Sequence, residues 1–110
     1  MTNDQRPTTI FHITSAGEAD AAKASGTYVP RTFEAEGFVH CSYQHQLDGV
    51  ASRFFRDRTG LVVLEIDPSR LTCDVRDENL EGGLELFPHI YGKVPLDAVV
   101  AIHEFPMGLG

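Results

Sequence analysis

The sequence predicts a single α+β domain in which two early helices cover one sheet. At 110 residues, the chain suits one domain spanning residues 1–110. Hydrophobic residues make up 42% of it and include seven Phe, which is enough for one modest core. Helix-like and strand-like segments alternate in the N-terminal half, and strand-like segments dominate afterwards. This order is typical of an α+β fold.

Strands are predicted where β-branched, aromatic or continuously apolar residues cluster. These segments are residues 8–14, 38–42, 61–66, 73–78 and 98–105. The run 61–66 is apolar almost throughout, which indicates a central strand with both faces buried. Asp67-Pro68-Ser69 then predicts a turn, and an acidic loop around Gly82-Gly83 is expected later. Residues 27–37 contain a Pro and a Gly and are expected to be irregular.

Two helices are predicted in the N-terminal half of the chain. Ser15 and Glu18 form a capping box at the start of an Ala-rich helix over 16–25, and Gly26 is a natural C-terminal stop. Ser42 is expected to cap the second helix. The inner face of that second helix follows helical spacing, at Leu47, Val50, Ala51 and Phe54.

The charge balance and the cysteine content limit the classes of function. A net charge of −7 with only nine Lys and Arg argues against non-specific nucleic-acid binding, which depends on neutralising phosphates. A local basic spot can still serve one small anionic ligand. Cys41 and Cys73 make no disulfide framework, and the sequence shows no signal segment and no apolar run of membrane-spanning length. We therefore expect a cytoplasmic protein with reduced thiols and no membrane association.

Three segments place a histidine and a hydroxyl residue on the same side of an extended chain. Alternate strand residues face opposite sides, so residues two positions apart share a face. The pairs are His12 with Thr14, His40 with Ser42, and His89 with Tyr91. We expect these side chains to line one polar pocket, while Val39 and Cys41 face elsewhere.

Each of these residues also has a structural explanation of its own. A half-buried histidine is common, Ser42 can serve as a helix cap, and Tyr91 can simply pack. The repetition of one pattern on three predicted strands nevertheless favours the shared pocket. In such a pocket, imidazoles donate, accept or shuttle protons, and hydroxyls orient a substrate.

Other kinds of site are less well supported by the residues. His40 and His45 lack the i, i+4 spacing that suits a zinc ion on one helix face, and Cys41 is expected to point away, so no metal is expected. Ser42 lacks the Gly-x-Ser-x-Gly elbow of acyl-transfer enzymes. Cys73 is expected to be a small buried residue and His103 an ordinary edge or surface residue. The acidic residues expected to be solvated charges are Glu18, Glu34, Glu36 and Glu81.

The two His-x-[Ser/Thr] motifs, at His12 and His40, are similar to the signature of two-histidine phosphoesterases. In those enzymes, paired imidazoles act as acid and base on a cyclic or 2′-linked phosphate. Such enzymes are usually longer, with the motifs far apart in two similar lobes, whereas this sequence has no internal repeat. This hypothesis stays open as an alternative.

Three longer segments resemble a family of small bacterial domains of unknown function, number 952 in that series. They are Phe11-His12-Ile13-Thr14, Glu36-Gly37-Phe38-Val39-His40-Cys41-Ser42 and Phe87-Pro88-His89-Ile90-Tyr91-Gly92. The resemblance covers roughly residues 9–105. It implies a compact relative of the ADP-ribosyltransferase fold, with a split sheet of mixed or antiparallel strands around a nicotinamide-nucleotide cleft.

The same resemblance implies NAD as the cofactor and roles for particular residues. In ADP-ribosyltransferases, a His or Arg on the first core strand grips the cofactor ribose, and His12 matches that position. A Ser or Tyr on the next strand assists at the nicotinamide side, and His40 or Ser42 matches it. A late-strand Glu drives transfer, and this third position falls on Glu78, Glu85 or His89.

The leading hypothesis is a small ADP-ribosyltransferase-like domain that binds NAD, another nucleotide or a phosphorylated small molecule. The catalytic candidates are His12, His40, Ser42 and His89. The residues expected to hold the cofactor are His12, Thr14, Ser42 and Tyr91. A two-histidine phosphoesterase-like hydrolase and a non-catalytic ligand-binding or partner-binding module stay open as alternatives. The sequence predicts no particular oligomeric state.

Overall fold

The computed structural model describes residues 8–55, 59–79 and 85–105. The strands are β1 (Ile10–Ser15), β2 (Thr27–Tyr28), β3 (Val39–His40), β4 (Leu61–Ile66), β5 (Val75–Glu78), β6 (Phe87–Ile90), β7 (Val94–Pro95) and β8 (Val99–Glu104). The helices are α1 (Ala16–Ser25), α2 (Phe33–Glu36) and α3 (Leu47–Phe54). Short 3-10 turns are η1 (Gln44–Gln46), η2 (Pro68–Arg70) and η3 (Leu96–Ala98).

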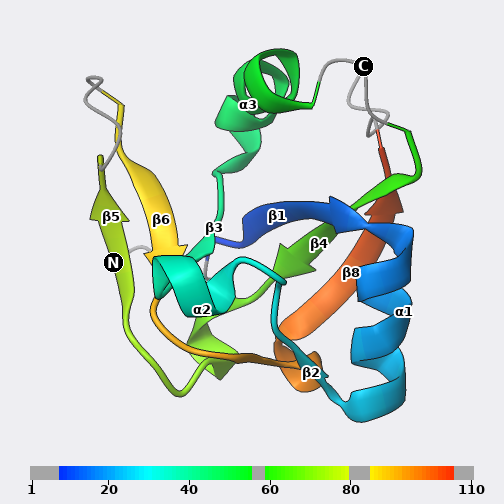
Figure 1. The fold of residues 1–110 in the computed structure, drawn as a ribbon. Helices are drawn as coiled ribbons and strands as arrows, with labels where there is room; N and C mark the ends of the chain where they lie inside the picture. The colour runs from blue at the N-terminus through cyan, green and yellow to red at the C-terminus, as the bar shows by residue number, and fades with distance from the viewer. Residues whose placement is uncertain (1–7, 56–58, 80–84, 106–110) are drawn as a thin grey trace, which may run out of the picture.

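The strands form two separate three-stranded sheets, whereas the order of elements indicated one sheet and the family resemblance implied a split one. One sheet has the order β1-β4-β8 and the other β3-β6-β5, and β2 pairs with β7. All of these pairings are antiparallel. The two larger sheets stand on opposite sides of the ribbon in Figure 1. The predicted α+β class is therefore confirmed, and the prediction of one sheet is wrong.

Within residues 8–55, 59–79 and 85–105, one isolated backbone bridge joins the two sheets, between Phe11 of β1 and Ser42 just after β3. The Phe11 N–H donates to the Ser42 carbonyl at 2.8 Å, and the Ser42 N–H donates to the Phe11 carbonyl at 2.7 Å. The prediction that Ser42 caps the next helix is wrong, because Ser42 lies in this bridge and the short turn η1 comes before α3. The following turn, η1, has Tyr43 at its N-terminal cap.

The two predicted helices are present and pack on opposite faces of the β1-β4-β8 sheet. On one face, Ala19 and Ala22 of α1 join the core that contains Ile10. On the other face, Leu47 and Val50 of α3 join the core that contains the remaining apolar residues of β1. Complete burial of one large aliphatic side chain contributes about 2 kcal/mol, so both faces stabilise the sheet. The side chain of Phe54 lies outside the described residues.

The first helix begins and ends at the predicted residues. The Ser15 hydroxyl accepts the backbone N–H of Glu18 at 3.1 Å, and Gly26 ends α1 in the left-handed region with φ of 88°. Only half of the predicted capping box forms, because the Glu18 carboxylate bonds elsewhere.

Residues 27–37 are more regular than expected. Tyr28 pairs with Val94 of the distant strand β7, which makes β2 a strand. The Pro30 carbonyl accepts the Phe33 N–H at 3.0 Å, and the short helix α2 follows. Gly37 ends α2 with φ of 81°. Long-range pairing of β2 with β7 is what the local residue composition could not predict.

The other expected elements are present, with some shorter than predicted. β4 is central in its sheet, between β1 and β8, as its apolar run indicated. The strand expected over 73–78 begins at Val75, and the one over 98–105 spans Val99–Glu104. The acidic loop expected around Gly82-Gly83 lies outside the described residues.

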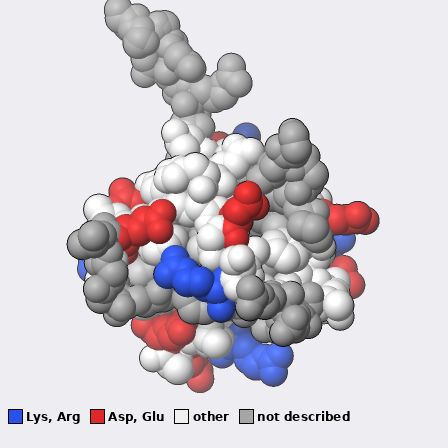
Figure 2. All heavy atoms as spheres, turned by 90° about the horizontal axis from the view of Figure 1, so that it is seen from above, with Lys and Arg blue, Asp and Glu red and all other residues white. Residues whose placement is uncertain are grey.

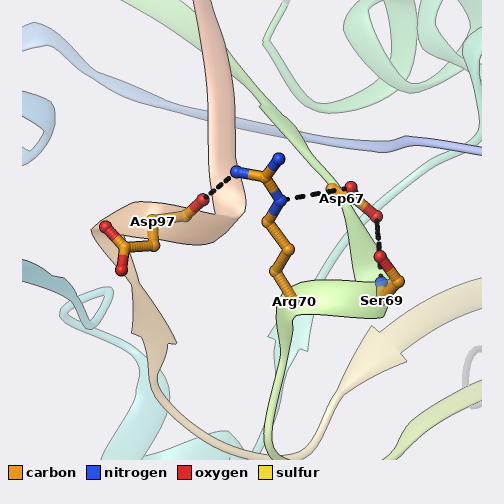
Figure 3. A network of polar contacts seen from close by, with 4 residues as sticks. All are labelled: Asp67, Ser69, Arg70 and Asp97. Carbon is orange, nitrogen blue, oxygen red and sulfur yellow. Dashed lines mark hydrogen bonds and ion pairs between the residues drawn. The ribbon is translucent and has the colours of Figure 1, made fainter.

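The turn predicted after β4 is the 3-10 turn η2, and a polar network ties it to η3 (Figure 3). Asp67 accepts the Ser69 N–H at 3.0 Å and the Ser69 hydroxyl at 2.7 Å. These bonds hold the pKa of Asp67 below its usual range. The Arg70 guanidinium contacts Asp67 at 3.5 Å and donates to the Asp97 carbonyl at 3.2 Å.

The surface of the described residues is characterised by the length of its helices and by the distribution of charge on one face. No helix within the described ranges is long and apolar enough to cross a bilayer. Acidic and basic side chains are interspersed on the described part of the face in Figure 2. This mixture agrees with the composition of the chain, which has nine Lys and Arg residues and a net charge of −7.

Candidate functional site

One cavity of about 750 Å³ lies where the two sheets meet. Five of the six side chains predicted for the pocket line it, and these are His12, Thr14, His40, Ser42 and His89. They come from β1, β3, the bridge residue after β3, and β6. Thr14, Ser42 and His89 are buried, whereas His12 and His40 are partly exposed. The volume is within the range usual for small-molecule sites.

Tyr91 is the predicted pocket residue that does not line the cavity. Its hydroxyl donates to the Glu78 carboxylate at 2.5 Å, and the Arg76 guanidinium lies 4.4 Å from the centre of its ring. The chain leaves the strand at Ile90, so alternation no longer fixes the direction of the next side chain. The prediction that Tyr91 lies in the pocket is therefore wrong in position.

Val39 and Cys41 face away from the cavity, as alternation predicts. Both are completely buried in the core cluster on the α1 side. Burial raises the pKa of the Cys41 thiol far above its ordinary value, so the thiol stays protonated.

Both ring nitrogens of His12 bond to other protein groups. Nδ1 lies 2.7 Å from the backbone carbonyl of His40, and because a carbonyl only accepts, Nδ1 is the donor. Nε2 lies 2.7 Å from the Tyr28 hydroxyl. Tyr28 was not predicted for the site. The signal that was available is a lone tyrosine just after a helix stop, because a buried Tyr hydroxyl needs a polar partner.

The contacts continue from Tyr28 to a carboxylate. The Tyr28 hydroxyl donates to Thr14 Oγ1 at 2.8 Å, and Thr14 Oγ1 donates to Glu18 Oε1 at 2.7 Å. The Arg31 N–H donates to Glu18 Oε2 at 3.0 Å. Glu18 was expected to be a solvated charge, and that expectation is wrong because Thr14 and the Arg31 backbone draw it to the cavity wall. Glu36 also lines the cavity instead of only facing solvent.

A proton count shows what this network can do. Three contacts link His12 to Glu18, but the hydroxyls of Tyr28 and Thr14 supply only two protons. Burial lowers the pKa of His12 to about 4. Burial pushes the pKa of Glu18 up, but bonds from Thr14 and Arg31 outweigh it and lower the pKa overall. At neutral pH, with Tyr28 donating to Thr14 and Thr14 to Glu18, the contact without a proton is the one between His12 Nε2 and the Tyr28 oxygen.

His89 is held on the cavity wall by a carboxylate behind it. Its Nδ1 lies 3.0 Å from Glu78 Oε1, the same oxygen that accepts the Tyr91 hydroxyl. Bonds from Tyr91 and His89 lower the pKa of Glu78, which therefore stays ionised at neutral pH. The Phe38 ring stacks on the imidazole with centroids 4.3 Å apart, and the His40 ring lies 5.1 Å away.

The geometry separates the three residues considered for the third catalytic position. His89 lines the cavity. Glu78 lies behind it, on β5. Glu85 is exposed and accepts the Gln46 amide at 3.2 Å, away from the cavity. Of the three, the cavity therefore presents an imidazole and neither carboxylate.

His103 also has a specific partner outside the cavity. Its Nε2 lies 2.8 Å from Glu65 Oε1, across β8 and β4. Thr9 donates to the other oxygen of the same carboxylate at 2.9 Å. His103 is therefore on the strand predicted for it, but it belongs to a polar cluster between neighbouring segments.

Fold and cavity together define the class of this protein as a small α+β domain with a cleft between two antiparallel sheets that is lined by both polar and apolar side chains. The chain belongs to the DUF952 family, whose model matches residues 13–102 and is described as a protein of unknown function. The family identified from the sequence is thus confirmed.

Solved structures of one relative support the same assignment. The crystal structure of protein CC0527 from Caulobacter crescentus is 34% identical, with a TM-score of 0.76, over 86% of this chain and 83% of that one. Its solution NMR structure is also 34% identical with a TM-score of 0.76, over 88% of this chain and 84% of that one. No curated protein matches the chain at a significant level.

Proposed function

We propose that the cavity binds NAD or a related nucleotide and that the domain is a small ADP-ribosyltransferase-like transferase. The observation that supports this best is the convergence of three imidazoles on one cavity of about 750 Å³ at the junction of two sheets. The imidazoles come from His12, His40 and His89, and hydroxyls of Thr14 and Ser42 accompany them. The cavity size suits a nucleotide-sized ligand.

The charges of the cavity wall also suit NAD. The cavity is lined by one basic residue, the exposed Arg31, and by two acidic residues, Glu18 and Glu36. NAD has an anionic diphosphate and a cationic pyridinium ring, so a wall with both signs complements both ends of the ligand. A guanidinium bonds phosphate oxygens through its paired N–H groups, and Arg31 is the residue we assign to the diphosphate.

The resemblance to ADP-ribosyltransferases supplies the remaining roles. His12 would take the first-strand position beside the ribose, and Ser42 or His40 the position beside the nicotinamide. Because both nitrogens of His12 are bonded, its hydrogen bond to a ribose hydroxyl requires the Tyr28 hydroxyl to give up its place. His89 would occupy the third position in place of a late-strand Glu.

Nucleotide binding is tested by calorimetry and thermal unfolding with NAD, ADP-ribose and AMP. A ligand at 100 times its Kd stabilises the folded state by about 2.7 kcal/mol, which raises Tm by several degrees. We expect Arg31→Gln to weaken NAD binding at least tenfold without altering the fold, since only its backbone N–H bonds to Glu18. His12→Ala is expected to abolish the Tm shift.

Lys23→Gln is the matched control, because it removes one positive charge from exposed α1 outside the cavity. This variant should bind NAD as the wild type does. If no nicotinamide or adenine nucleotide changes Tm or releases heat, the proposed function is wrong. Binding without any release of nicotinamide would favour the non-catalytic binding module over the transferase.

The contacts give less support to a two-histidine phosphoesterase that uses His12 and His40. Both nitrogens of His12 already bond to protein groups. The imidazole ring of His40 also lies beside that of His89, with centroids 5.1 Å apart. Turnover of 2′,3′-cyclic nucleotides that disappears in His12→Ala would restore that hypothesis.

A further inference from the structure

We propose that His89 is the proton-accepting residue of the cavity and that its Nε2 accepts a hydrogen bond from a hydroxyl group of the ligand. The ligand class is a hydroxyl-bearing molecule, such as a ribose, or a water beside it. The hydrogen bond itself needs no particular ligand identity. The proton transfer described below rests on the proposed function.

The partners of His89 define which nitrogen can accept. An ionised carboxylate is only an acceptor, so the 3.0 Å contact with Glu78 places the proton of the neutral ring on Nδ1. Nε2 then has a lone pair directed away from that bond. The Tyr91 hydroxyl donates to the same Glu78 oxygen and holds the carboxylate in place. An imidazole base that is oriented by a carboxylate on its other nitrogen occurs in many enzymes.

The register of the β3-β6-β5 sheet gives the direction of Nε2. His89 lies opposite Arg76 on β5 and opposite His40 on β3. Nδ1 bonds to Glu78, which is on β5, so the other side of the ring faces β3. Phe38 and His40, from that side, line the cavity together with His89. Nε2 is therefore directed toward the cavity side of the sheet.

Nε2 is also the one polar side-chain atom within the described ranges that is buried and has no hydrogen-bond partner. His89 as a whole residue is only 2% exposed. A buried polar atom without a partner destabilises the folded state and is rare in native proteins, so it points to a role in binding. Because Nε2 is buried, a ligand reaches it only when a bordering ring turns. Phe38 is partly exposed and stacks on His89, and its turning breaks no polar bond of its own ring.

Two other ionisable groups on the cavity wall, Glu18 and His12, are less suited to take a proton. Both oxygens of Glu18 already accept hydrogen bonds, from Thr14 and from the Arg31 backbone. Both nitrogens of His12 are bonded, and burial makes that ring a weak base at neutral pH. His89 combines a free lone pair at Nε2 with a carboxylate that holds its other nitrogen.

With NAD as the ligand, the proton transfer has a simple balance. The hydroxyl of water or of an acceptor molecule gives its proton to Nε2, and its oxygen forms a bond to C1′ of the ribose. The C1′–N bond of the nicotinamide riboside breaks, and its electron pair leaves with nicotinamide, which becomes neutral. Imidazolium and carboxylate then form an ion pair, and the proton passes later to solvent. General-base catalysis of this kind contributes a factor of about 10²–10⁴ in rate.

The hydrogen bond is tested by long-range ¹H–¹⁵N NMR of the imidazole groups in the full chain. We expect the ligand-free protein to show His89 protonated at Nδ1 and not at Nε2. NAD, or D-ribose as a fragment probe, should shift the Nε2 resonance of His89. Glu78→Gln should mix the two tautomers, whereas the matched variant Glu85→Gln, beside β6 but outside the cavity, should match the wild type.

Each outcome separates this proposal from the proposed function. A ligand-free ring protonated at Nε2, or an Nε2 resonance that neither NAD nor D-ribose shifts, overturns the proposal. If NAD raises Tm but leaves Nε2 unshifted, the proposal fails and nucleotide binding stands. If no nucleotide binds but D-ribose shifts Nε2, the proposed function fails and the role of His89 stands.

The proton transfer has its own measurement, the release of nicotinamide from NAD. We expect His89→Gln to lower kcat at least about 100-fold while the Kd for NAD changes only a few-fold. Far-UV circular dichroism checks that this buried variant folds, and Glu78→Gln provides a second variant with the ring intact. Full turnover in both variants overturns the transfer. Nicotinamide release that is absent in the wild type, despite NAD binding and a shifted Nε2, also overturns it.

Discussion

His12 combines two hydrogen bonds with surroundings that disfavour its charged form. Its Nδ1 bonds to the His40 carbonyl and its Nε2 to Tyr28. Burial lowers its pKa from 6.5 to about 4, although the backbone bond to His40 acts in the opposite direction. The residue therefore makes folding stability depend on pH as well as shaping the cavity.

Folding stability is expected to fall as the pH drops from about 6.5 to about 4. In that window the unfolded chain binds a proton at His12 that the folded chain does not, so acid favours unfolding. The full effect is at most about 3 kcal/mol for a shift of this size. Urea unfolding of the wild type and His12→Gln between pH 4 and 7 measures it. A stability difference between the two proteins that stays constant with pH would contradict the assignment.

Removing the Tyr28 hydroxyl should destabilise the fold. Tyr28→Phe leaves the ring packed but removes the group between His12 and Thr14, so buried polar atoms lose a partner. A cost of about 1–3 kcal/mol is expected in urea unfolding. Tyr43→Phe is the control, because its hydroxyl bonds Asp77 in an exposed contact. If both variants lose the same free energy of unfolding, the hydrogen bonds of the Tyr28 hydroxyl do not stabilise the fold more than an exposed bond does.

Gly92, in the bend after β6, has no room for a side chain. Gly92 follows β6, and a Cβ built on it would lie 2.6 Å from Cys73 Sγ and 2.7 Å from Cys73 Cβ. Both distances are far below a normal van der Waals contact. The Gly in the Phe-Pro-His-Ile-Tyr-Gly segment therefore serves packing against Cys73 and needs no ligand to explain it.

Gly92→Ala should accordingly cost about 1–3 kcal/mol of folding stability, the usual range for overpacking. Gly17→Ala in α1 is the matched control, because nothing lies within 4 Å of its built Cβ. That control should be neutral or slightly stabilising, since Ala favours a helix over Gly. Thermal unfolding of the two variants compares them. Adding Cys73→Gly to Gly92→Ala should restore part of the loss, and a double variant no better than the single would refute the steric explanation.

At the scale of the whole molecule, the cavity exists because the two sheets meet through one backbone bridge. The bridge between Phe11 and Ser42 brings β1 next to β3, and the cavity residues of both strands lie around it. Figure 1 shows the two sheets diverging from this region. In that view α1 lies beside the β1-β4-β8 sheet, and α2 lies in front of the region where the sheets meet. A ligand that contacts both walls would hold the sheets together, which is why nucleotide binding should raise Tm.

The local signals predicted much of the fold. The helix over 16–25 has the predicted cap and stop, and the apolar run 61–66 is the central strand. The single-sheet expectation failed because strand pairing depends on contacts between distant residues. Tyr28 became a strand residue only through Val94, which is far away in the sequence.

The sequence alone determined which side of each strand carries polar chemistry. His12 with Thr14 and His40 with Ser42 share faces because side chains alternate along an extended backbone, and that period is local. The tertiary structure decided which distant groups complete the site. It brought Tyr28 and Glu18 to His12, and it placed Glu78 behind His89. Those choices depend on sheet register and on burial, because both follow from packing across the whole chain.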